Sequence, residues 1–286
     1  MAIFLQRGCA TVSQRSLLPV VLAGGLLATS ASYGSKLRVQ GDRWLAISSL
    51  TGSVQFITGN ERRAAMRGDR LASVGDTLIT RDQASARLAI DQAVGSVTMA
   101  QNSHMRIQAL SITQNGGRVT ELAVVRGQVR LRTRPFTSPE STLEIHTPVG
   151  VSGVRGTDFG VTVQPDGQTA IATEEGSVVA SAQGKTVTVG AGLQSIIRPG
   201  EPPTPAQVFL DDPTLRIEAI RAISSAVASV SGSTDAVNLV KVNGEPIQVE
   251  EDGRFEFEVP ISREYQIDAE VTTPLGTQRS YQLVVP

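Results

Sequence analysis

Apolar and polar residues alternate one by one along most of this chain, in short runs separated by glycine, asparagine and aspartate. In residues 85–90, for example, Ala86, Leu88 and Ile90 share one face. Such a period of two places neighbouring side chains on opposite faces of an extended strand. No segment between residues 44 and 199 keeps a convincing helical period over three turns. The pattern therefore predicts an all-β protein.

The same alternation predicts several buried strand faces further along the chain. The residues concerned are Val97, Met99, Met105, Ile107, Ala109, Leu143, Ile145, Phe159, Val161, Val163, Val187 and Val189. Leu122 and Val124, followed by Val129 and Leu131, predict a hairpin that turns at Arg126 and Gly127.

A glycine, a small or polar residue and a valine recur in order at the expected starts of four strands. The triplets begin at Gly52, Gly95, Gly127 and Gly176. Their spacing is too uneven for a regular solenoid. We therefore expect an elongated β-roll, or a sandwich-like stack of similar hairpins, over residues 42–200.

The chain changes character after residue 200. Residues 201–234 start with a proline-rich stretch, which predicts a linker, and Asp212 followed by Pro213 is compatible with the start of a short helix. Whether residues 214–231 form helix or strand stays open from the sequence. Strand alternation returns in residues 235–286, with Asn243-Gly244 as a strong hairpin signal. We expect a small immunoglobulin-like or fibronectin-like β-sandwich there.

The first 31 residues have the pattern of a signal peptide. Arg7 and Arg15 precede an apolar run of about a dozen residues, and small residues follow it up to Ala31. The run is short for a membrane-spanning helix, although an uncleaved anchor is an alternative and the only route to a membrane. We expect a periplasmic or otherwise exported protein of the cell envelope. Cleavage would remove Cys9, the single cysteine.

Charge and composition exclude several classes of protein. A formal net charge of -1 does not suit a nucleic-acid-binding protein, which usually clusters lysine and arginine. His104 and His146 are the only histidines, and no G-x-S-x-G motif is present. We expect no enzyme, no metal site and no cofactor. Glu174-Glu175 is the one carboxylate pair worth examining, but adjacent strand residues point to opposite faces.

The stretch TPVGVSGVRGTDFGV, residues 147–161, has glycines spaced by three and leads into a strand. A phosphate-binding glycine loop would lead into a helix instead. Gly150, Gly153 and Gly156 suit a tight crossover that needs close backbone approach and positive φ. Arg155 and Asp158 are close enough to bridge that turn. We expect a structural clasp there.

These residues resemble the core of FecR-domain proteins. The similarity rests on Gly153, Val154, Arg155, Gly156, Thr157, Asp158 and Phe159, on the following Glu175-Gly176-Ser177-Val178, and on upstream motifs around Gly68-Asp69, Gly75-Asp76 and 84–88. It covers about residues 45–200. In that family the resemblance implies a periplasmic domain that senses an outer-membrane iron transporter, and a cytoplasmic domain that controls a sigma factor. About sixteen residues precede the apolar run here, so we expect no direct contact with a sigma factor.

Four arginines form a candidate binding face. Arg126, Arg130, Arg132 and Arg134 flank the inward-facing Val129 and Leu131. Arginine clusters suit phosphate or carboxylate groups, although the pattern favours a solvated face balanced by nearby glutamates.

Together, the sequence predicts a non-catalytic exported binding or scaffold protein of the envelope. Its expected partner is an envelope protein or a cell-wall glycan. The alternative function is a periplasmic sensing module that relays an envelope state through a separate membrane partner.

Overall fold

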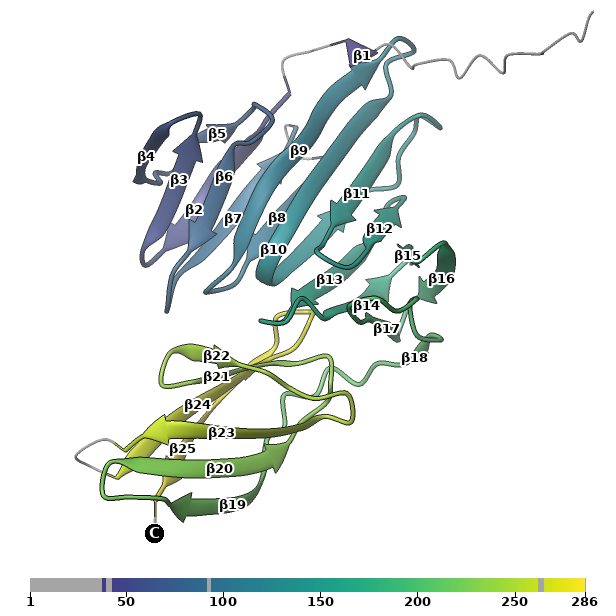
Figure 1. Ribbon diagram of the computed structural model, residues 1–286. Helices are drawn as coiled ribbons and strands as arrows, with labels where there is room; N and C mark the ends of the chain where they lie inside the picture. The colour runs from purple at the N-terminus through teal and green to yellow at the C-terminus, as the bar shows by residue number, and fades with distance from the viewer. Residues whose placement is uncertain (1–37, 40–42, 92–93, 262–264, 286) are drawn as a thin grey trace, which may run out of the picture. The chain divides into compact units, whose positions relative to one another are not determined.

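A computed structural model describes residues 38–39, 43–91, 94–261 and 265–285, and every regular element in these ranges is a β-strand (Figure 1). The prediction of an all-β protein is confirmed. The expected signal peptide, residues 1–31, lies outside the described residues. Within the described ranges, no helix is long and apolar enough to cross a membrane.

Residues up to about 210 form a β-roll of two sheets that share one long strand. Sheet A runs in the order β4 (Glu61–Ala64), β3 (Val54–Thr58), β6 (Thr77–Thr80), β9 (His104–Thr113), β10 (Arg118–Thr133), β11 (Thr142–His146), β12 (Val151–Val154), β15 (Ser177–Ala182) and β16 (Lys185–Gly190), with β1 (Arg38–Val39) paired to the end of β9. Sheet B runs in the order β5 (Arg70–Leu71), β2 (Leu45–Thr51), β7 (Ser85–Ile90), β8 (Gly95–Met99), β10, β13 (Asp158–Val163), β14 (Thr169–Glu175), β17 (Leu193–Ile197) and β18 (Gln207–Val208).

Strand β10 passes from sheet A to sheet B without turning back. Its first half pairs with β9 and β11, and its second half pairs with β8 and β13. The predicted hairpin at Arg126 and Gly127 is therefore wrong. A two-residue hairpin of type I′ needs positive φ at both residues, but only Gly127 has it, at 87°. The single glycine, next to a bulge at Val124/Arg126, bends the strand instead.

The repeated glycine triplets mark the passage between sheets at three of their four positions. Gly52 lies between β2 and β3, Gly127 within β10, and Gly176 between β14 and β15, and all three have positive φ. Gly95 is the exception, since it begins β8 within sheet B. The three irregularly spaced triplets thus mark corners of a roll whose turns differ in length.

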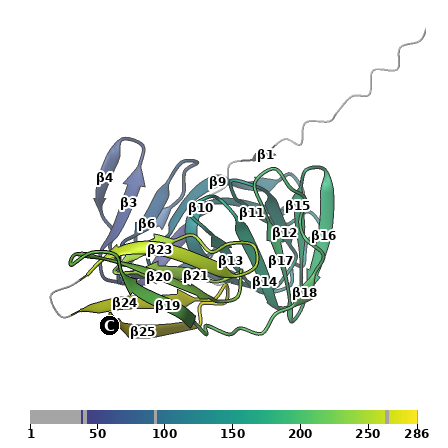
Figure 2. The same cartoon turned by 60° about the horizontal axis from the view of Figure 1, so that its bottom comes forward.

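The alternating apolar residues fill the space between the two sheets, which face each other in Figure 2. Phe159 is completely buried there, together with inward residues of every long strand. The largest of its companions are Leu45, Ile47, Leu71, Leu78, Leu88, Ile90, Met99, Met105, Ile107, Leu122 and Leu131. All the residues that the alternation placed inward are buried except Val187, which is partly buried. Leu45, Ile47, Leu71 and Leu78 were not among the predicted inward residues.

The C-terminal part is a β-sandwich with its own buried cluster. One sheet has the order β19 (Arg216–Ala222), β20 (Val227–Ser233) and β23 (Arg254–Pro260), and the other has the order β22 (Glu245–Ile247), β21 (Leu239–Val242), β24 (Gln266–Thr272) and β25 (Gln278–Val284). Asn243 and Gly244 connect β21 to β22 with positive φ at both residues. The predicted hairpin at this position is confirmed.

Residues 214–231 contain strands β19 and β20, so the short helix that the sequence allowed there does not form. Residues of β20 alternate strictly between partly exposed and buried positions, which suits a strand. Ala228 and Val230 belong to the same buried cluster as Phe255. The apolar residues after Pro213 are spaced irregularly because β19 contains a bulge between Ile217 and Ala219.

Candidate functional site

The glycine and arginine motif forms β12, a short turn and β13, and no helix begins at Phe159. Of the three glycines expected to need positive φ, only Gly156 has it, at 78°. A Cβ atom at Gly156 would lie 2.3 Å from Cα of Pro135, so this position needs both the backbone conformation and the missing side chain. Gly153 lies in β12 with open space around it.

Asp158 forms ion pairs with two arginines of the neighbouring strand β10. Its carboxylate oxygens accept hydrogen bonds from Nε of Arg130 at 2.8 Å, Nη2 of Arg130 at 2.9 Å and Nε of Arg132 at 2.6 Å. The bonds to Asp158 raise the pKa of Arg130 above its usual value. The sequence suggested that Asp158 bridges the turn to Arg155, but Asp158 bonds to the two arginines of β10 instead. Arg155 instead donates a hydrogen bond to the carbonyl oxygen of Pro139 at 2.8 Å.

The four arginines of the candidate binding face do not present one free cationic surface. Arg130 and Arg132 are engaged by Asp158, and Arg130 also donates to the carbonyl oxygen of Leu275 at 2.9 Å. Arg126 and Arg134 are exposed, one at each end of the row. Two of the four are thus committed to contacts within the protein.

Strand β13 has one face in the core of the roll and one face against the C-terminal sandwich. Phe159, Val161 and Val163 point into the core. On the other face, the hydroxyl of Thr162 donates to the carbonyl oxygen of Val237 at 2.9 Å. Gln164, just beyond the strand, donates to the carbonyl of Ala236 at 3.1 Å and accepts from the amide of Val249 at 3.0 Å.

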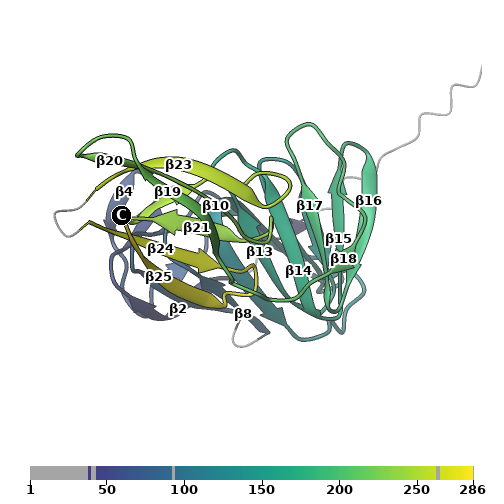
Figure 3. The ribbon, with the colours of Figure 1, turned by 90° about the horizontal axis from the view of Figure 1, so that it is seen from below.

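The turn between β24 and β25 packs directly on Gly160 of the motif strand. Figures 1 and 3 show this turn beside β13. A Cβ atom at Gly160 would lie 1.8 Å from the carbonyl oxygen of Pro274. That oxygen accepts a hydrogen bond from Nε2 of Gln128 at 2.7 Å. Gln128 is 2% exposed and Leu275 is 3% exposed, so the contact excludes water. We call this contact, made by Gln128, Arg130, Gly160 and the turn at 273–276, the joint.

Asp211 braces the same turn from the connecting segment. Its carboxylate accepts hydrogen bonds from the hydroxyl groups of Thr273 and Thr277. Tyr281 ties β25 to this segment as well, because its hydroxyl donates to the carbonyl of Pro213 at 2.9 Å and accepts from the amide of Leu215 at 3.0 Å. The segment that the sequence predicted as a linker therefore takes part in holding the joint.

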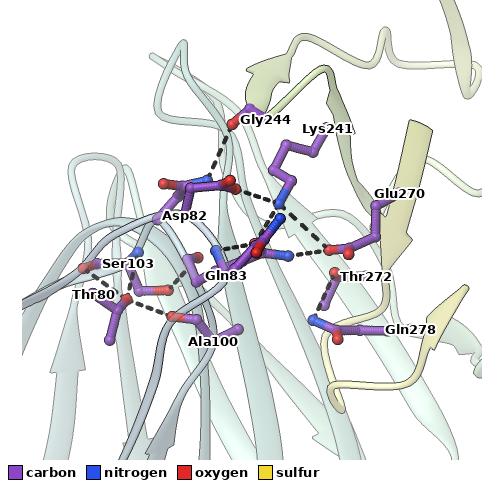
Figure 4. A network of polar contacts seen from close by, with 12 residues as sticks. Thr80, Asp82, Gln83, Ala100, Ser103, Lys241, Gly244, Glu270, Thr272 and Gln278 are labelled. Atoms are coloured by element: carbon purple, nitrogen blue, oxygen red, sulfur yellow. Dashed lines mark hydrogen bonds and ion pairs between the residues drawn. The ribbon is translucent and has the colours of Figure 1, made fainter. Parts of the chain in front are cut away.

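A second group of polar contacts joins the roll to the sandwich at Gln101, and Figure 4 shows it from close by. The side-chain oxygen of Gln101 accepts hydrogen bonds from the amide of Gln83 and from Nζ of Lys241, and its nitrogen donates to Glu270. Lys241 also pairs with Asp82 at 2.7 Å. Each charged group here has a partner of opposite charge, which offsets the cost of partial burial.

A pocket of about 420 Å³ opens between the joint and this polar group. Apolar side chains from both parts of the chain form its walls, among them Val125, Val163, Leu239 and Pro246. Arg126, Asp166, Lys241 and Glu270 supply its charged groups. A concave apolar surface with a few polar groups, placed between two structural units, is the usual form of a small-molecule site.

His104 lies opposite Arg126 in the ladder between β9 and β10, close to this pocket. Burial lowers the pKa of His104, and the positive charges of Arg126 and Arg106 lower it further. Protonation is therefore less favourable in the folded protein than in the unfolded chain. The free energy of unfolding should decrease as the pH falls below the ordinary value of 6.5, and level off below the lowered pKa.

We expect an NMR titration of His104 to show this lowered pKa, and Arg126→Gln to move it upward. Arg67→Gln, which changes an exposed arginine on a distant loop of the roll, should leave the titration unchanged. A titration of His104 that does not respond to Arg126→Gln would show that the two side chains do not interact.

The other histidine, His146, lies on β11 beside two carboxylates. Its Nε2 is 3.2 Å from Glu144 and 3.9 Å from Glu121. Within the described ranges, no group of three or more histidine, aspartate or glutamate side chains is placed to hold a metal ion. Glu174 and Glu175 are both exposed at the end of β14.

These features define a class of protein: an all-β roll whose glycine and arginine motif forms a sheet strand, with a β-sandwich packed against that strand. Residues 76–179 match the family described as FecR protein. The chain therefore contains a FecR domain, as the motif residues indicated. No curated protein matches the chain.

Solved structures add remote similarities. Two crystal structures of a candidate anti-sigma factor from Parabacteroides distasonis each align with a TM-score of 0.38 and 13% identity, over 46% of this chain and 59% of that one. The alignment thus spans less than two thirds of the anti-sigma factor chain. The polysaccharide lyase BACCELL_00875 aligns with a TM-score of 0.20 and 12% identity, over 85% of this chain and 40% of that one.

Proposed function

We propose that this chain is a non-catalytic, exported binding module of the cell envelope. The observation that supports this most directly is how the polar groups of the motif strand are used. Thr162, Gln164 and the neighbouring Gln128 are buried and hydrogen-bonded across the contact with the C-terminal sandwich. A reacting group must be free to meet its substrate, whereas these groups hold two parts of the protein together.

The pocket beside the joint supports a binding role for the same reason. Lys241 and Glu270, two of its charged groups, are held by Gln101 and by each other at 3.9 Å. A general base would instead need an accessible lone pair to accept a proton from the substrate. The expected partner is an envelope protein or a cell-wall glycan.

We propose a revised division of the chain to go with this function. The FecR β-roll extends from residue 42 to about residue 210, where β18 completes sheet B. A short connecting segment follows, and an immunoglobulin-like sandwich begins near residue 215 instead of 235. The buried cluster that contains both Leu215 and Phe255 supports the earlier start. The hydroxyl of Tyr281, bonded to backbone groups near Pro213, resembles the tyrosine corner of such sandwiches.

The alternative function is a periplasmic sensing module that relays an envelope state through a separate membrane partner. The FecR match favours this alternative, since the resemblance implies sensing in that family. The hydrogen-bonded joint would suit it too, because a ligand bound between two units can change how they are held.

A pull-down with the full chain from a membrane extract separates the two functions. Recovery of wall glycan or of structural envelope proteins would support the binding module. Recovery of a transporter, a kinase or a sigma-factor system component would support the sensing module. Retention of nothing beyond what an unrelated β-sandwich bait retains would contradict a protein or glycan partner in either function. Mass spectrometry of the N-terminus of the exported protein would test cleavage near Ala31.

A further inference from the structure

The walls of the pocket are aliphatic. Its apolar lining residues are Ala100, Val125, Pro148, Val163, Pro165, Leu239, Val240 and Pro246. None of the described lining residues is aromatic. Planar bases bind by stacking on aromatic rings, so this lining favours a flexible aliphatic group over a nucleobase. Its volume of about 420 Å³ lies within the range of roughly 300–1,000 Å³ for small-molecule sites.

The charged groups of the pocket differ in how much of their charge is already balanced. Lys241 is paired with Asp82 and hydrogen-bonded to Gln101, and Glu270 accepts from the same Gln101. Asp166 is exposed and accepts a hydrogen bond from the amide of Gln168. Arg126 is exposed as well, and in the described part of the protein it has no carboxylate partner.

Arg126 belongs to a small group of bases on the outer face of sheet A. It lies opposite His104 in the ladder, and Arg106 follows two residues along β9 on the same face. Both guanidinium groups are close enough to disfavour the charged form of His104. The same positive potential would stabilise an anion bound beside Arg126.

We propose that this pocket binds an aliphatic monoanion, a medium-length acyl chain that ends in a carboxylate. The acyl chain contacts the apolar walls from both parts of the protein, and the carboxylate binds the guanidinium of Arg126. This assignment rests on the proposed binding function, for which it names the ligand class. It also explains why an aliphatic cavity lies next to Arg126, which forms no ion pair with a carboxylate of the described residues.

Calorimetric titration of the full chain with decanoate, below the concentration at which it forms micelles, tests this assignment. We expect saturable binding of decanoate. Acetate has the anion without the chain, and decyltrimethylammonium has the chain with the opposite charge, so neither should bind. Binding of decyltrimethylammonium as tight as that of decanoate would overturn the role of Arg126 and with it the proposal.

Variants separate the two halves of the ligand. Arg126→Gln should weaken decanoate binding about 10-fold to 100-fold, because a hydrogen bond to a charged group contributes about 1.5–3 kcal/mol. Val125→Asp should abolish binding by adding a charge to the apolar wall. The control Arg67→Gln should bind as the original chain does. Equal binding by Arg126→Gln and the original chain would overturn the proposal.

The source of the anion and the wider function need separate readouts. Flotation with phosphatidylglycerol vesicles, in the absence of decanoate binding, would indicate a lipid surface and overturn the proposal.

A successful pull-down without decanoate binding would leave the binding module in place and reject only this ligand class. Decanoate binding that depends on Arg126, together with an empty pull-down, would support the pocket and reject a protein or glycan partner. Thermal unfolding of each variant checks that it is folded.

Discussion

Gly160→Ala is expected to make the roll and the sandwich unfold in two separate steps. In the original chain the joint couples the two buried clusters, so we expect a single cooperative transition. A Cβ atom at Gly160 would lie 1.8 Å from the carbonyl oxygen of Pro274 and 2.3 Å from its carbonyl carbon. Backbone atoms of a braced turn cannot move aside cheaply, so the turn would leave β13. The bonds from Gln128 and Arg130 to the turn would then be lost.

Calorimetry and fluorescence together measure this separation. Trp44 is the only tryptophan and lies next to β2, so its fluorescence reports on the roll. Gly153→Ala is the matched control, since a Cβ atom there would meet nothing within 4 Å. That variant should unfold as the original chain does or be slightly more stable, because alanine loses less entropy than glycine. Identical calorimetric profiles for the two alanine variants would show that the joint does not couple the clusters.

Asp158→Asn is expected to lower the free energy of unfolding by about 2 kcal/mol. The Asp158 side chain is 13% exposed and pairs with two arginines. An asparagine cannot balance either charge, so Arg130 and Arg132 would repel each other at the edge of the joint. Urea denaturation followed by Trp44 fluorescence measures the loss.

The control for this variant is Asp268→Asn, which changes an exposed aspartate on β24. A surface substitution of this kind usually changes stability by less than about 0.5 kcal/mol. High salt should reduce the difference between the original chain and Asp158→Asn only slightly, because a partly buried ion pair is poorly screened. Equal losses for the two asparagine variants would mean that the contacts of Asp158 with the arginines do not stabilise the fold.

Much of the fold could be predicted because period-two alternation is a local property. Phe159, Val161 and Val163 are buried where the pattern placed them, and Asn243-Gly244 forms the expected hairpin. Two predictions failed where a local signal was ambiguous. Gly127 bends β10 instead of reversing the chain. The residues after Pro213 form strands because they pair with each other and with β23 in one sheet.

The candidate site was much less accessible from the sequence. Gln128, Thr162 and Gln164 occupy the polar positions of their alternating runs, so the pattern alone assigns them to solvent. The only available signal was the run of small and neutral polar residues at Gly160, Thr162 and Gln164, where an exposed face usually has charged groups. The sequence placed Arg130 in the candidate binding face and Asp158 in the glycine and arginine motif, but their pairing depends on the register between β10 and β13.

The sequence by itself determined the strands, the inward faces of the roll and the structural nature of the motif, because each follows from which side of a strand its neighbours occupy. The tertiary structure alone decided that the outward face of β13 is covered, that the turn at 273–276 rests on Gly160, and that a pocket lies beside Arg126. These features join residues as far as 146 positions apart. Distances in space between such residues depend on how whole sheets pack, and no local pattern encodes that.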